Sequence, residues 1–222
     1  MKYVKFLFVA LATTFALAAC HPDDPNKPNN GGNGGNDDDP KPEEIQANFM
    51  SYKTADGTFD SLQINYVSLQ GMGILDEDDI LFNLAMSTVD IEDELQRVID
   101  NRDNAGSIKT QAPAFTIFFN LHSPTSDFYD RKYFTDSELT DKPMRVLYFP
   151  LTADTEVLKW YRDGAGLKFC YNGTLEINKI DDNTYDVTFD GDAGKLRVHY
   201  RGDINTDTNI GALQTEINDI NY

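Results

Sequence analysis

The stretch LKFCYNGTLEINKIDDNTYDVTFDGDAGKLRVHY, residues 167–200, contains four short runs of β-forming residues separated by turn residues. In the last three runs apolar and polar side chains alternate, which is the two-residue period of a strand with one buried face. Asn, Asp and Gly, the residues that tight turns favour, fill the gaps between the runs. The stretch therefore predicts a meander of antiparallel hairpins, with strands over residues 167–171, 174–180, 184–189 and 196–200.

Other segments upstream also have the composition of strands. One of them alternates along its length, and the others are short runs rich in branched, apolar and aromatic residues. They cover residues 58–69, 80–86, 115–121 and 144–149.

Two segments depart from the strand pattern. Residues 90–101 place Leu95 and Val98 one helical turn apart, behind Asp90, which is a favourable N-cap residue. Residues 154–162 show a similar spacing after another acid. Both segments are expected to be helices that cover a sheet or barrel.

Together these segments predict a mainly β fold in a single domain over residues 45–222. We expect an antiparallel β-sandwich or a barrel-like meander, with one or two short helices inserted between strands.

The N-terminus has the profile of a signal peptide over residues 1–19. Lys2 and Lys5 precede an uncharged apolar run, residues 6–19. This run is shorter than the ~20 residues that a membrane-spanning helix requires.

The order Leu17-Ala18-Ala19-Cys20 resembles the lipobox of bacterial lipoproteins. The resemblance implies that the chain is cut before Cys20 and that Cys20 is acylated, which would attach the protein to a membrane. Residues 20–44 consist mainly of Asn, Gly, Asp and Pro and predict a disordered acidic tether.

Asp23-Asp24 resembles the acidic export signal of surface lipoproteins in the Bacteroidota. The whole chain is similar to the small lipoproteins of these bacteria, many of which have no assigned function. The resemblance implies a lipid-anchored protein of the outer membrane that faces the cell exterior.

The composition argues against some partners and some classes of protein. The 222 residues carry a formal charge of −18, which disfavours nucleic acid because phosphate binding requires a basic surface. Cys20 and Cys170 are the only cysteines, too few for a disulfide scaffold.

The chain contains none of the common catalytic or nucleotide-binding motifs, such as Gly-x-Ser-x-Gly, HExxH or a P-loop. We therefore expect no enzyme activity, no catalytic residue and no cofactor, although a hydrolase that uses two carboxylates stays open as an alternative. Cys170 with His122 or His199 would form a nucleophilic pair if the fold brought them together, but a buried structural cysteine is favoured.

Residues 203–209 resemble the start of a calcium-binding loop, because Asp203, Asn205 and Asp207 alternate along it. Thr208 and Gln214 stand where such a loop requires Gly and Glu. The sequence leaves open whether these residues bind calcium or form a solvated turn.

Aromatic residues suggest what the domain binds. Aromatic faces stack on sugar rings in many β-sandwich modules, so a glycan or an outer-membrane protein is the expected partner. The alternative is an adhesin or fimbria-associated assembly subunit that offers an edge strand or residues 211–222 for strand exchange. The aromatic residues considered for a binding platform are Phe128, Tyr129, Tyr133, Phe134, Trp160 and Tyr161.

Replacing Cys20 tests the anchor. We expect the Cys20→Ala protein to leave the detergent phase in Triton X-114 partitioning, because it lacks the acyl chains. We expect the variant with Asp23→Asn and Asp24→Asn to stay membrane-bound but to resist protease added to whole cells. A Cys20→Ala protein that still partitions into detergent would refute lipidation at this residue.

Overall fold

In the computed structural model, the residues that can be described are 47–53, 59–76, 79–111, 114–135, 144–151 and 154–220. The signal peptide, Cys20 and the tether lie outside them. The described residues belong to one compact unit, Pro42–Tyr222.

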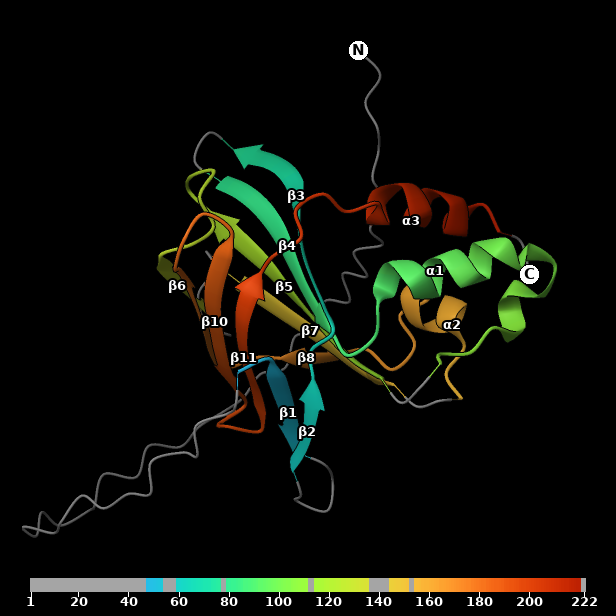
Figure 1. Cartoon of the computed structure of the whole chain (residues 1–222), viewed down its shortest axis with the longest axis horizontal. Helices are drawn as coiled ribbons and strands as arrows, with labels where there is room; N and C mark the ends of the chain where they lie inside the picture. The colour runs from blue at the N-terminus through green and yellow to red at the C-terminus, as the bar shows by residue number, and fades with distance from the viewer. Residues whose placement is uncertain are drawn as a thin grey trace, which may run out of the picture. The chain divides into compact units, whose positions relative to one another are not determined.

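Two antiparallel sheets form the body of this unit, as Figure 1 shows. The six-stranded sheet has the order β2 (Phe59–Gln63), β1 (Phe49–Lys53), β11 (Leu196–Asp203), β10 (Thr184–Gly191), β9 (Gly173–Lys179) and β6 (Arg131–Thr135). The five-stranded sheet has the order β3 (Tyr66–Asp76), β4 (Asp79–Ser87), β5 (Ala114–Ser123), β7 (Met144–Leu151) and β8 (Lys168–Cys170). The predicted mainly β antiparallel sandwich is confirmed, and the barrel-like alternative is wrong because the sheets do not close on each other.

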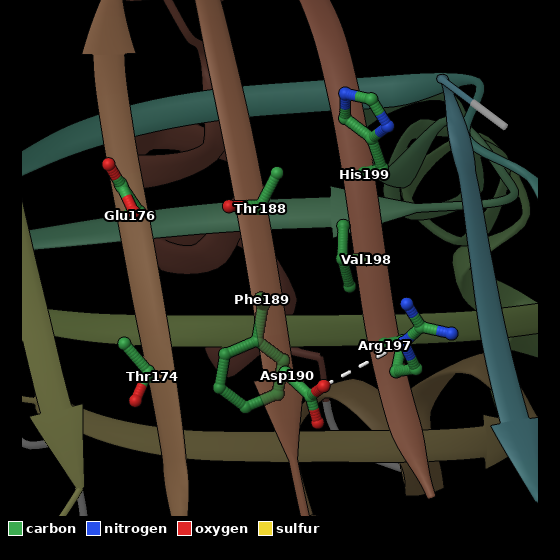
Figure 2. A pocket seen from close by; sticks show the side chains of 8 residues that line it. All are labelled: Thr174, Glu176, Thr188, Phe189, Asp190, Arg197, Val198 and His199. Carbon is green, nitrogen blue, oxygen red and sulfur yellow. Dashed lines mark ion pairs between the residues drawn. The ribbon is translucent and has the colours of Figure 1, made fainter. Parts of the chain in front are cut away.

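The main hydrophobic core lies between the sheets, where strands of one sheet run across those of the other (Figure 2). Leu84, Phe119 and Val146 of the five-stranded sheet belong to this core, as do Leu175 and Val187 of the other sheet. Burial of each such side chain stabilises the fold by about 1.5–3 kcal/mol. The alternating pattern of the sequence therefore reflects one inward face on each sheet.

The chain changes sheets where the sequence predicted its first hairpin. Asn172-Gly173 does not join two paired strands, because β8 pairs with β7 and β9 pairs with β6 and β10. The predicted strand over residues 58–69 likewise divides at Ile64 and Asn65, with β2 in one sheet and β3 in the other. The rest of the predicted meander, β9 to β11, is confirmed.

Three α-helices and a 3₁₀ helix gather beside the five-stranded sheet (Figure 1). Asp90 caps the first helix as predicted, because its carboxylate accepts a hydrogen bond from the Asp93 backbone N–H at 3.2 Å. The second helix is shorter than the expected residues 154–162, and its N-cap residue is Glu156. The helices are α1 (Ile91–Asp100), η1 (Arg102–Ser107), α2 (Val157–Tyr161) and α3 (Ile210–Asn218).

The helix α3 was not expected from the sequence. It buries Leu213 and Ile217, and it occupies most of the segment 211–222 that was considered for strand exchange. Up to Asn218 this segment is therefore a packed helix and not a free strand.

A second core forms between the helices and the outer face of the five-stranded sheet. Leu95 of α1, Trp160 of α2 and Ile217 of α3 are fully buried there, together with Ala85 and Phe149 of the sheet. The five-stranded sheet is thus buried on both faces at the end that the helices cover.

Two glycines allow the Phe189 ring to lie in the main core. Gly173 and Gly191 face each other across β9 and β10. A Cβ atom on Gly191 would lie 2.5 Å from the Phe189 ring and 2.7 Å from the Cys170 sulfur. The close approach of ring and backbone therefore requires glycine at this position.

We expect Gly191→Ala to lower the free energy of unfolding by about 1–3 kcal/mol, because the added methyl group overpacks the core. Urea unfolding of the purified domain measures this change. Gly71→Ala is the matched control, since a Cβ atom there meets nothing within 4 Å, and we expect it to stay within about 0.5 kcal/mol of the wild type. Equal stability of the two variants would contradict the packing argument.

Candidate functional site

The helices leave part of the outer face of the five-stranded sheet uncovered. The strand register aligns Ala85, Phe118, Leu147 and Phe169 in one row across β4, β5, β7 and β8. Exposure rises along this row, from 1% at Ala85 beneath the helices to 47% at Phe169 on the edge strand. The row therefore runs from the second core to an open surface.

Phe169 and Tyr171 form an exposed aromatic pair at this edge. Their ring centroids lie 6.1 Å apart and their planes differ by 28°. Tyr171 is 62% exposed. Both rings lie next to the half-buried Leu147, and neither belongs to a hydrophobic core formed by the described residues. An exposed apolar patch of this kind usually marks a binding surface.

A polar row lies next to the apolar one on the same face. Asn83, Asn120 and Arg145 are aligned by the register of β4, β5 and β7. The side-chain NH₂ group of Asn83 donates a hydrogen bond to the side-chain amide oxygen of Asn120 at 2.6 Å. Among the described residues, none forms a hydrogen bond with the side-chain oxygen of Asn83 or with the side-chain NH₂ group of Asn120. This row therefore offers a donor and an acceptor to a ligand.

We call the part of these two rows that lies beyond the buried Ala85, together with the adjacent tyrosine, the aromatic face. It consists of Phe118, Leu147, Phe169, Tyr171, Asn83, Asn120 and Arg145.

The inward residues of β8 hold the aromatic pair in place. Cys170 is 4% exposed, lies opposite Val146, and donates from its sulfur to the Asn172 carbonyl at 3.3 Å. The Lys168 ammonium donates to the Tyr52 hydroxyl at 3.0 Å, which ties β8 to the other sheet. Because side chains alternate along a strand, these inward contacts turn the Phe169 ring outward.

The structure does not place a histidine with Cys170 as a nucleophilic pair. His122 pairs with Asp79 and His199 pairs with Asp186, each at 3.0 Å. His199 lies on the outer face of its sheet, whereas Cys170 lies between the sheets. Burial raises the pKa of the Cys170 thiol to about 12, which opposes formation of the nucleophilic thiolate. The predicted structural cysteine is confirmed as buried.

A shallow pocket of about 250 Å³ lies on the outer face of the six-stranded sheet. Figure 2 shows Glu176, Thr188 and His199 in one row across β9, β10 and β11, which agrees with the register. The pocket is lined by Thr174, Glu176, Thr188, Phe189, Asp190, Arg197, Val198 and His199.

Several charged side chains that line this pocket form ion pairs with neighbouring residues. Lys132 pairs with Glu176 at 2.9 Å, and Arg197 pairs with Asp190 at 3.8 Å. The hydrogen bond from Lys132 lowers the pKa of Glu176. A carboxylate hydrolase needs an acid whose pKa is raised so that it can donate a proton, so the Glu176 shift does not favour this alternative.

The aromatic residues singled out from the sequence do not gather into a platform. Phe128 and Tyr133 are buried between the sheets, and Trp160 is buried beneath the helices. Phe134 is 48% exposed on the edge strand β6. Tyr129 and Tyr161 are half-buried, and they pack against different cores. The expectation of a platform at these positions is wrong.

Phe169 and Tyr171 were missed as binding residues, although the sequence contained a signal for them. Strand alternation places them opposite Cys170, and a buried cysteine implies that its neighbours face outward.

In the segment that resembles a calcium-binding loop, polar side chains form hydrogen bonds with nearby residues of the protein. Asp203 accepts a hydrogen bond from the Thr184 hydroxyl at 3.3 Å, and Asn205 accepts one from the Asp207 backbone N–H at 3.0 Å. Within the described ranges, no group of three or more His, Cys, Asp or Glu side chains is arranged to hold a metal ion.

No family model, no curated protein and no solved structure matches this chain. Among the helices that the structure describes, none is long and apolar enough to cross a bilayer.

The raised pKa of Cys170 predicts an unreactive thiol. In the Cys20→Ala protein, which has Cys170 as its one cysteine, we expect very slow reaction with Ellman's reagent at pH 8 and fast reaction in urea. Absorbance of the released thiolate measures both rates. Equal rates in the folded and unfolded protein would contradict the burial of this group.

Proposed function

We propose that this protein is an outer-membrane lipoprotein whose β-rich domain binds glycans at the cell surface through the aromatic face. The exposed stacked pair Phe169 and Tyr171 carries this proposal. The lipobox at Cys20 and the acidic tether support the anchored location.

The apolar row suits the flat side of a sugar ring. A pyranose presents C–H groups on its faces, and these pack against the negative face of an aromatic ring. The planes of the Phe169 and Tyr171 rings differ by 28°, their centroids are 6.1 Å apart, and both rings are exposed, so aromatic surface of each is available to a ligand. Neither ring has to leave a core to meet a ligand, which lowers the cost of binding.

The polar row suits the hydroxyl groups of the same ligand. A hydroxyl group both donates and accepts, and the Asn83–Asn120 pair leaves one acceptor and one donor group for it. Binding sites commonly combine an apolar surface with a few such polar groups that fix the orientation.

The composition of residues 21–44 supports a domain held at a distance from its anchor. A flexible coil of this length would span roughly 25–30 Å in root-mean-square distance. This span would hold the aromatic face away from the membrane, where extended polysaccharides are accessible.

The other candidate functions have weaker support. An assembly subunit that donates its C-terminal segment conflicts with the packing of α3. A carboxylate hydrolase would need a raised pKa at an acid such as Glu176, whose pKa is lowered instead. The aromatic face could bind a partner protein instead of a glycan, and the following experiment distinguishes the two.

The test compares glycan binding by the lipidated protein in detergent with that of the Phe169→Ala/Tyr171→Ala variant. We expect a glycan array to identify ligands and calorimetry to show at least a tenfold weaker affinity for the variant, since two aromatic contacts contribute about 1–3 kcal/mol. Phe134→Ala is the matched control, because Phe134 is an equally exposed aromatic residue on the other sheet.

Either of two results would overturn the proposal. One is a wild-type protein that binds no glycan but binds an outer-membrane protein through Phe169 and Tyr171. The other is a double variant that binds glycan as well as the Phe134→Ala control does.

A further inference from the structure

We infer that the aromatic face selects glycans that carry anionic groups, and that Arg145 binds the anion. This inference rests on the proposed function and names the class of ligand. The observations that carry it are the place of Arg145 on the face and the absence of an ion pair between Arg145 and any described residue.

Arg145 lies where a ligand on the aromatic pair would extend. It is exposed, it follows Asn120 in the polar row, and it lies two residues before Leu147 on β7. Val146 faces Cys170 in the register of β7 and β8, so Arg145 and Tyr171 are the next residues on these neighbouring segments. A sugar ring stacked on the pair would therefore have the guanidinium group beside it.

Arg145 makes no ion pair with any described residue. Arg97 pairs with Glu94 and Arg102 pairs with Glu216, each at 2.8 Å. Within the described part of the fold, no carboxylate therefore forms an ion pair with the Arg145 guanidinium group.

The chemistry of the guanidinium group points to an anion. It has five N–H donors in a planar fork and no acceptor, so it forms two parallel hydrogen bonds with a carboxylate. Bonds to an ionised oxygen are about twice as strong as those to a neutral hydroxyl. A uronic acid or a sulfated sugar supplies such oxygens next to an apolar ring face.

The net negative charge of the protein does not prevent this contact. At physiological ionic strength, charges further apart than about 8 Å are largely screened. The guanidinium in direct contact with the ligand therefore outweighs acids elsewhere on the surface.

Matched sugars test the inference with the lipidated protein in detergent. The probes are oligosaccharides of glucose, galactose and mannose, each compared with its uronic acid and its sulfate ester. We expect the wild type to bind the anionic form of at least one backbone tenfold more tightly than the neutral form. The uronic acid and sulfate arms show which anion is preferred.

Substitutions then assign the preference to the residue. We expect Arg145→Gln to lower the affinity for the anionic sugar about tenfold and to leave that for its neutral counterpart unchanged. Arg145→Lys should recover part of the affinity, because it restores the charge without the planar fork. Arg201→Gln is the control, since Arg201 is exposed on the other sheet and has no ion pair with a described residue.

The possible failures are distinguishable. If neutral sugars bind as well as anionic ones and still require Phe169 and Tyr171, the glycan function stands and this inference is wrong. If Arg145→Gln keeps the anionic preference, the role of Arg145 is wrong. If none of the probes binds, both proposals are refuted.

Discussion

The pairing of β8 with β7 is the constraint on which the aromatic face depends. This strand has only three residues, and Cys170 anchors it by packing between the sheets. Once Cys170 faces inward, the geometry of a strand turns Phe169 outward, and Tyr171 stacks on it. The same inward contact brings Cys170 against the glycine-lined space that holds Phe189. The surface and the core of this region are thus two sides of one short strand.

The arrangement of the helices determines which part of the sheet is available. The α-helices cover one end of the outer face of the five-stranded sheet and bury Ala85 and Phe149. Beyond them, the same rows of side chains continue to the edge strand, where the apolar residues become exposed and polar partners lie beside them. A sheet covered along its whole length would be only a scaffold. The partial cover leaves part of this face exposed, over strands that pair with each other.

Local patterns predicted most of the strands, because alternation and turn residues are properties of short segments, but they missed β1 and β6. The capped helix behind Asp90 was also predictable from local chemistry. The change of sheet at Asn172 was not, since the partner of β8 is determined by distant residues of β7. The burial of Trp160 was also hidden, because only the packing of distant segments places this ring inside a core. The outward direction of Phe169 was readable from its alternation with Cys170. The helix α3 has only nine residues, and its few apolar positions form too short a pattern to predict a helix.

The place of β1 in its sheet has a consequence for the order of folding. β1 lies between β2 and β11, and it pairs with residues that come about 150 positions later in the chain. The six-stranded sheet is therefore incomplete until nearly the whole polypeptide is present, and contacts of such long range form slowly. A chain of this topology cannot complete its six-stranded sheet during synthesis until residues 196–203 have left the ribosome and can pair with β1.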